Sequence, residues 1–172
     1  MGGEEEFSDS RSQQKAKNSM LISYWHFSFT VADLERSIDF YTNVIGMKLV
    51  HRQEQSNEYT RKLVAYPDAS LKVAQLAIEG MPGVRSGHLL ELVEYVSPRC
   101  DPTDTATCRP GSAHLAFQVV DAWAKYHAMV AAGVRFKSEP VAITAGINKG
   151  GFTCYFLDPD DITLEIIQAP PG

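Results

Sequence analysis

The stretch "HFSFTVAD" (residues 26–33) returns in altered form as "HLAFQVVD" (114–121). Both copies place histidine first, phenylalanine fourth, valine sixth and aspartate last. Apolar residues at helical spacing follow each copy, and the helical pattern ends at Gly46 in the first case and at Gly133 in the second. Self-similarity over this length indicates a duplicated structural unit. The sequence therefore predicts two copies of one motif, in which a strand opens with histidine and leads into a helix.

The ends of the two units also match. "LLELVEY" (89–95) and "ITLEIIQ" (162–168) each place an acid between β-favouring apolar residues. Between the helix and this closing strand, we expect further strands in "EYTRKLVAYP" (58–67), "LKVAQLAIEG" (71–80), "VAITAG" (141–146) and "GFTCYFLDPDD" (151–161). The fold class that follows is α+β. It has two βαβββ modules related by pseudo-twofold symmetry, which form a curved mixed sheet.

Composition limits the organisation of the chain. With 172 residues, of which 44% are hydrophobic, the chain can bury one substantial core. We expect one domain over residues 21–172, with module one at about 21–100 and module two at about 110–169. Residues 1–20 hold almost no large apolar side chains, which predicts a disordered tail.

Charge and cysteine content exclude several classes of partner. The net charge is −5, and no Lys/Arg cluster lies beside aromatic residues, so nucleic acid is not an expected partner. No apolar run is long enough to span a membrane or to serve as a secretory leader. The three cysteines form an odd set, which favours reduced thiols and a cytoplasmic location. A local disulfide between Cys100 and Cys108 stays open.

Strand alternation places acids and histidines together. Side chains two residues apart point to the same face of a strand. In each module this gives one sheet face that carries a histidine and a glutamate: His26 and Glu91 in the first, His114 and Glu165 in the second. On the same faces lie Ser28, Thr30, Val93 and Tyr95 in module one, and Ala116, Gln118, Thr163 and Ile167 in module two.

His26, Glu91, His114 and Glu165 form a plausible divalent metal site, around which the curved mixed sheet would lie. Imidazole and carboxylate suit nickel, zinc, cobalt, manganese or iron. A metal also explains why Glu91 lies in an apolar strand, since a buried charge is tolerated when it coordinates a cation. Glu94 falls on the opposite face of that strand and is expected to meet solvent. The remaining histidines, His51, His88 and His127, lack such partners and are expected on loops or on a helix surface.

At these residues the chain resembles the vicinal oxygen chelate superfamily, which includes glyoxalases, bleomycin resistance proteins and dioxygenases. The resemblance covers about residues 22–169 and is greatest to metal-dependent glyoxalase I. It lies in "VADLERSIDFYTNVIGMKLVHR" (31–52), "AHLAFQV" (113–119) and "YFLDPDDITLEIIQ" (155–168), where Asp161 replaces the glycine of the family's DPDG. The resemblance implies that His26, Glu91, His114 and Glu165 are the four metal ligands.

The resemblance also implies a reaction. The superfamily chelates two neighbouring substrate oxygens on its metal, and the resulting enediolate forms as a proton leaves the adjacent carbon. A lyase or isomerase of this type, including an epimerase, would use Glu165 as its first candidate base and Glu91 as its second. A homodimer is expected, with the metal site built within one chain or across two.

The expected substrate is a small molecule whose identity the residues leave open. Glyoxalase I has an arginine and an asparagine that hold glutathione at the positions of Thr30 and Tyr95 here. A hydroxyl and an aromatic ring favour a less polar substrate, with Gln118 and Lys149 as further candidate contacts. The loop 142–151 is expected to close over the site.

Two alternatives stay open. An extradiol-type iron dioxygenase would need only His26, His114 and Glu165, which leaves Glu91 without a role. A drug-binding resistance protein would need an apolar groove and no metal ligands.

Overall fold

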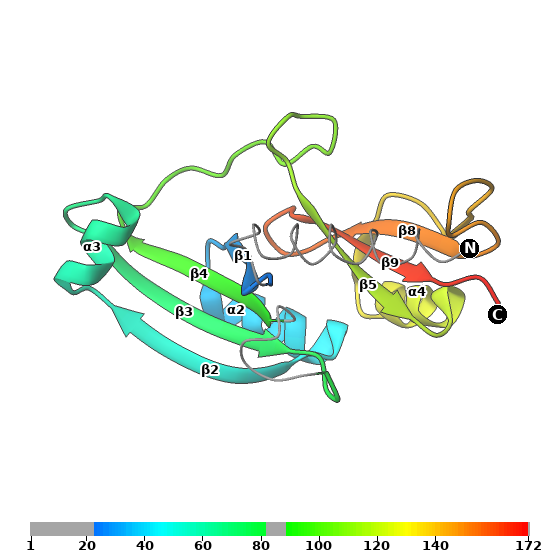
Figure 1. Cartoon of the computed structure of the whole chain (residues 1–172), viewed down its shortest axis with the longest axis horizontal. Helices are drawn as coiled ribbons and strands as arrows, with labels where there is room; N and C mark the ends of the chain where they lie inside the picture. Colours follow the sequence, from blue (N-terminus) through cyan, green and yellow to red (C-terminus); the bar gives the residue numbers. More distant parts are fainter. Residues whose placement is uncertain (1–22, 82–88, 172) are drawn as a thin grey trace, which may run out of the picture.

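The computed structural model describes residues 23–81 and 89–171, so the predicted tail at 1–20 and His88 lie outside the described residues. Figure 1 shows two sheets on opposite sides of the molecule. The first sheet has the order β1-β4-β3-β2 and contains β1 (His26–Thr30), β2 (Lys48–Gln55), β3 (Ser70–Ala77) and β4 (Leu89–Ser97). The second has the order β5-β9-β8-β6, with β7 paired to β8, and contains β5 (His114–Val119), β6 (Arg135–Phe136), β7 (Val141–Ala142), β8 (Phe152–Leu157) and β9 (Thr163–Gln168). The helices are α2 (Leu34–Asp39), the π-helix η1 (Phe40–Ile45), α3 (Glu58–Val64) and α4 (Ala122–Ala131).

The two sheets have the same topology, which confirms the α+β class and the two modules. In each, the first strand pairs in parallel with the last, and the last pairs antiparallel with the strand before it. The register also repeats, because Ser28 lies opposite Glu91 and Ala116 lies opposite Glu165. Instead of one curved sheet, the structure has two separate mixed sheets, one for each module.

The helix that follows each histidine strand begins at the predicted aspartate. The Asp33 carboxylate accepts a 3.0 Å hydrogen bond from the backbone N–H of Arg36, and Asp121 accepts one of 2.9 Å from Ala124. These N-caps satisfy backbone donors that the first turn would leave free. Gly46 ends η1 with a φ of 95°, a left-handed conformation that glycine adopts at little cost.

Residues 58–67 were expected to form a strand and instead contain the helix α3. Asn57 caps this helix by accepting a 2.9 Å hydrogen bond from the N–H of Thr60. The strand that was expected there is supplied by β2, which begins directly after Gly46 and Met47. The N-cap and the good helix formers of 58–64 therefore favour the helix.

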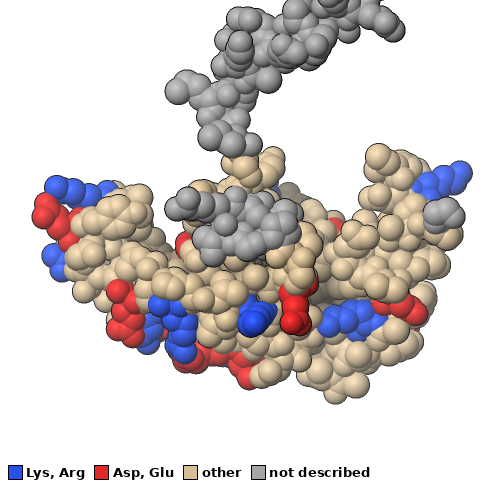
Figure 2. All heavy atoms as spheres, turned by 60° about the horizontal axis from the view of Figure 1, so that its bottom comes forward, with Lys and Arg blue, Asp and Glu red and all other residues tan. Residues whose placement is uncertain are grey.

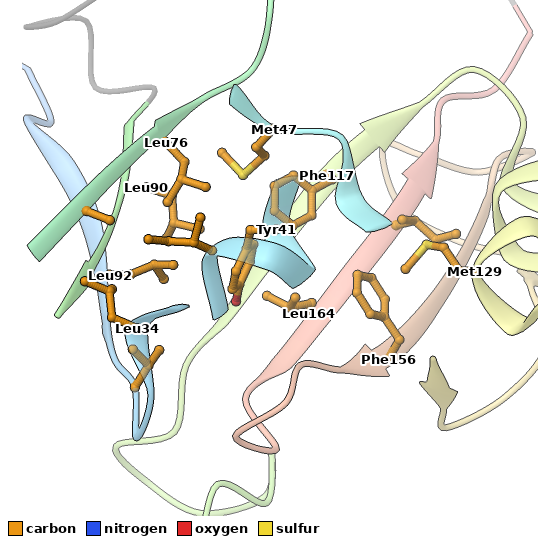
Figure 3. Packing of buried hydrophobic residues seen from close by; sticks show 14 of the residues in the cluster. Leu34, Tyr41, Met47, Leu76, Leu90, Leu92, Phe117, Met129, Phe156 and Leu164 are labelled. Atoms are coloured by element: carbon orange, nitrogen blue, oxygen red, sulfur yellow. The ribbon is translucent and has the colours of Figure 1, made fainter. Parts of the chain in front are cut away.

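The core is continuous across both modules (Figure 3). Tyr41 of η1 lies between the apolar side chains of the first sheet and those of the second. The first module contributes Leu34, Leu76, Leu90 and Leu92, and the second contributes Phe117, Met129, Phe156 and Leu164. The Tyr41 hydroxyl donates a 3.1 Å hydrogen bond to Asp158 in the turn between β8 and β9. A polar contact thus joins the modules inside the core.

Glu94 does not meet solvent as expected. Its side chain is buried, because this face of β4 packs against α2. The carboxylate accepts hydrogen bonds of 3.0 Å from the N–H of Leu34 and from Arg99, and the Lys72 ammonium lies 3.9 Å away. Two cations and a helix N-terminus offset the cost of burying this charge.

The three cysteines are free thiols, so Cys100 and Cys108 form no disulfide. No helix among residues 23–81 and 89–171 is long and apolar enough to cross a membrane. On the face shown in Figure 2, acidic and basic side chains lie interspersed rather than in a patch of one sign.

Candidate metal centre

The first histidine–glutamate pair lies on the first sheet. His26 opens β1, and Glu91 lies on the neighbouring strand β4. The His26 Nε2 atom is 3.5 Å from Glu91 Oε1. Gln75, directly opposite Glu91 on β3, donates a 3.1 Å hydrogen bond to the other carboxylate oxygen, Oε2. The side chains of His26 and Glu91 are 33% and 17% exposed, so the pair is accessible from one side.

The second pair has the same geometry on the second sheet. His114 Nε2 lies 3.3 Å from Glu165 Oε2. The Thr153 hydroxyl on β8 donates to the other oxygen, Oε1. The ring of Tyr155 lies 5.2 Å from that of His114, between centroids, and fixes one side of the imidazole. Glu165 is 12% exposed and His114 is 43% exposed.

The donor atoms of each pair fit two neighbouring ligands of one metal ion. Donors that each lie about 2.1 Å from an ion are about 3.0–3.4 Å apart when their bonds meet at about 90–110°. The observed separations, 3.5 Å for His26–Glu91 and 3.3 Å for His114–Glu165, are close to that range. Imidazole nitrogen with carboxylate oxygen is also the donor set that nickel, zinc, cobalt and iron accept. Both pairs therefore fit a divalent metal.

The four predicted ligands are brought together two by two. Within residues 23–81 and 89–171, the structure places no three metal-ligating side chains at one point. His26 and Glu91 belong to one sheet, and His114 and Glu165 belong to the other. One chain by itself thus presents two half-sites.

The predicted substrate contacts fall in different places. Thr30 and Tyr95 line one groove of about 420 Å³ at the ends of β1 and β4. Gln118 lines a separate pocket of about 110 Å³ beside Lys125. Lys149 lies in the exposed loop before β8 and lines neither of these two cavities. The structure therefore groups Thr30 with Tyr95 only.

The groove contains residues that the sequence did not single out. Tyr66, which follows α3, packs edge-on against Tyr95 with ring centroids 6.1 Å apart. Arg99 also lines the groove, and its guanidinium is held by Glu94. The other charged groups in the lining are the carboxylates of Asp101 and Asp160. Tyr66 was missed because the segment that holds it was expected to form a strand.

The loop 142–151 is closed by its own backbone. Ile143 donates a 2.9 Å hydrogen bond to Gly151, and Gly150 donates one of 2.9 Å back to Ile143. A Cβ atom on Gly151 would lie 2.2 Å from the carbonyl oxygen of Gln168. Gly151 is therefore required for close packing of the loop on β9.

We expect Gly151→Ala to lower the free energy of unfolding by at least about 2 kcal/mol, because backbone atoms cannot move aside as a flexible side chain would. The measurement is chemical denaturation followed by circular dichroism. Ile147→Ala is the matched control in the same loop, since Ile147 is 96% exposed. It should change stability by less than about 0.5 kcal/mol. Equal stability of the two variants would contradict the packing role of Gly151.

Two other described histidines, His51 and His127, belong to neither His–Glu pair. His127 lies on the exposed surface of α4, as predicted. His51 lies on β2 rather than on a loop, with its Nε2 atom 3.3 Å from Gln53. It lies opposite Gln75 in the sheet.

Comparison with known proteins identifies the family. Residues 24–166 match the family model of the Glyoxalase/Bleomycin resistance protein/Dioxygenase superfamily. The chain is 33% identical over 156 residues to a 2-epi-5-epi-valiolone epimerase from Actinomyces sp., covering 88% of this chain and 81% of the relative. It is also 33% identical over 146 residues to a probable lactoylglutathione lyase from Vibrio parahaemolyticus, covering 83% of this chain and 88% of the relative.

The fold has solved counterparts. A glyoxalase family protein from Bacillus cereus superposes with a TM-score of 0.71 over 90% of this chain and 98% of that one, at 18% identity. Fold, family model and similar relatives agree. The chain belongs to the Glyoxalase/Bleomycin resistance protein/Dioxygenase superfamily.

Proposed function

We propose that the chain is a metal-dependent enzyme that moves a proton at a carbon next to a carbonyl group, and that it acts as an epimerase or a related isomerase. The observation that carries this proposal is the duplicated His–Glu pair, with the same register in both modules. A dioxygenase needs one carboxylate ligand, whereas this chain presents two in equivalent positions.

His26, Glu91, His114 and Glu165 would hold the metal. When bound, the metal supplies Lewis-acid stabilisation of the negative charge that develops on substrate oxygens. Glu165 would remove the proton from one face of the substrate carbon, and Glu91 would act on the opposite face. An epimerase needs such a pair, because it removes a proton on one side of a stereocentre and returns one on the other.

The half-sites would be completed by a second copy of the chain. Two donors per sheet are too few for a stable divalent site, which takes four or more ligands. The histidine-bearing faces of β1 and β5 are largely exposed, so a second chain can pack against them. In this arrangement His26 and Glu91 of one protomer face His114 and Glu165 of its partner, and a twofold axis generates two equal sites.

Mixing two inactive variants tests this assembly. One variant carries alanine at His26 and Glu91, and the other carries alanine at His114 and Glu165. Random subunit exchange should restore about a quarter of the wild-type metal sites, because half of the dimers are mixed and each mixed dimer keeps one intact site. The measurement is bound metal per chain after exchange. No recovery, although native mass spectrometry shows mixed dimers, would place each complete site within one chain.

The groove favours a substrate other than a glutathione adduct. Thr30 and Tyr95 are neutral, and the Arg99 guanidinium in the same groove is already held by Glu94. Asp101 adds negative charge to the lining, whereas the Asp160 carboxylate is already paired with Arg36. A substrate with two free carboxylates would meet repulsion there instead of charge-assisted hydrogen bonds. The relative that is named an epimerase supports the same direction.

The decisive experiment is proton exchange in deuterated water, with 2-epi-5-epi-valiolone and a 2-oxoaldehyde–glutathione adduct as the two probes. Protein loaded with nickel, cobalt, zinc, manganese or ferrous iron is incubated with each probe and followed by proton NMR. We expect deuterium to enter the carbocyclic ketone and not the glutathione adduct. Turnover of the adduct alone would assign the lyase reaction. Exchange with neither probe under all five metals would contradict both assignments.

A further inference from the structure

Both candidate metal-site carboxylates are held by a neutral hydrogen-bond donor from the third strand of their sheet. Gln75 on β3 donates to Glu91 Oε2, and Thr153 on β8 donates to Glu165 Oε1. In each case the other carboxylate oxygen is the one that faces the imidazole, at 3.5 Å from His26 and 3.3 Å from His114. Each glutamate thus has one oxygen engaged by its sheet and one oxygen turned toward its histidine.

The two modules place this donor at different positions. Gln75 lies directly opposite Glu91, whereas Tyr155 occupies the equivalent place opposite Glu165. Thr153 lies two residues earlier on its strand, where the first module has Val73. A simple copy of one module would have kept one solution. Two different residues at two positions each hold the carboxylate oxygen that is not turned toward the histidine, which points to a shared requirement of the glutamates rather than to inherited packing.

Local packing explains why the hydrogen-bond donor occupies different strand positions in the two modules. Tyr155 cannot reach the carboxylate in the manner of Gln75, because its ring lies against His114 with 5.2 Å between centroids. The hydroxyl of Thr153 takes over, and it also lies 3.1 Å from the carbonyl oxygen of Ile166. In the first module, Val73 is buried and offers no donor.

We infer that Gln75 and Thr153 are positioning residues that orient Glu91 and Glu165 for metal binding, an inference that rests on the proposed function. A neutral donor fixes the rotamer of a carboxylate without cancelling the charge that attracts a cation. It also leaves a single oxygen free to act as a ligand. Neither residue contacts substrate in this role. Loss of an outer hydrogen bond of this kind typically weakens metal affinity about 10- to 100-fold.

The test is cobalt titration of the metal-free, full-length protein, with the visible absorption of bound cobalt as the readout. Gln75→Leu and Thr153→Val should each weaken cobalt affinity about 10- to 100-fold. Thr153→Ser, which keeps the hydroxyl, should restore affinity to within about threefold of wild type. Thermal unfolding of the metal-free variants shows whether each one is folded before titration.

A double variant moves the hydroxyl donor of the second module into the first. Gln75→Leu combined with Val73→Thr places a hydroxyl at the position that corresponds to Thr153, and it should recover most of the affinity lost by Gln75→Leu alone. Wild-type affinity in Gln75→Leu and Thr153→Val, or a Thr153→Ser variant as weak as Thr153→Val, would overturn the inference while the metal site stands. Wild-type protein that binds no cobalt would overturn the proposed function and this inference together.

Discussion

Glu165→Gln and Glu91→Gln should each abolish proton exchange from one epimer of the substrate and spare the other. If each carboxylate serves one face of the reacting carbon, then removing one base lowers exchange on its own face by about 10²- to 10⁴-fold. Glutamine keeps the shape of the side chain and one oxygen but loses the charge, so metal affinity should fall and exchange is measured at saturating metal. The measurement is deuterium uptake from each epimer separately in deuterated water, after metal content has been determined.

The matched control is Glu54→Gln, which changes an exposed carboxylate on β2 that belongs to neither His–Glu pair and does not line the groove. Its exchange rate and its stability should both stay close to those of the wild type. Equal loss of exchange from both epimers in Glu165→Gln, with normal metal content, would contradict the two-base arrangement and leave Glu165 as the one base. Full activity in both variants would remove the carboxylates from the proton transfer.

The candidate site was predictable because its signal is repeated. A single histidine on a strand, such as His26, carries little information, and the same holds for Glu91. Their recurrence as His114 and Glu165 in a second, similar stretch is what the sequence displays directly. The structure then places both pairs in the same register. Side-chain alternation in strands then fixes the face on which each residue lies. The two pairs in the structure follow from those facts alone.

The misassigned segments depend on tertiary contacts that a sequence pattern does not contain. Residues 58–64 include Tyr59, Leu63 and Val64, whose side chains suit a strand, but the Asn57 cap at their start favours a helix. Glu94 has the alternation of an outward residue, yet that side of β4 is covered by α2. Gln75 and Thr153 could not be predicted either, because they occupy different positions in the two modules.

Asp158→Ala should be among the most destabilising single substitutions in the chain, at about 3 kcal/mol or more. The side chain is 1% exposed and serves three donors. Its Oδ1 atom accepts hydrogen bonds of 2.8 Å from the N–H groups of Asp160 and Ile162, and Oδ2 accepts one of 3.1 Å from the Tyr41 hydroxyl. Each donor left without a partner in the interior costs about 1–3 kcal/mol. Urea denaturation measures the loss.

Asp158→Asn separates the geometry of this contact from its charge. The amide oxygen can still accept from both N–H groups, while its NH2 group can donate to the Tyr41 oxygen, so the cost should stay below about 1.5 kcal/mol.

Burial raises the pKa of Asp158, and the hydrogen bonds from Ile162, Asp160 and Tyr41 offset this only in part. A carboxyl group whose pKa is higher in the folded chain than in the unfolded chain stabilises the fold most at low pH. That contribution is lost as the pH rises through the folded pKa. The stability of the native protein relative to Asp158→Asn should therefore fall as the pH rises above the unfolded value of roughly 3.9. A constant difference between the two proteins above that pH would show that Asp158 titrates alike in both states, and the buried link between the modules would then owe its strength to geometry alone.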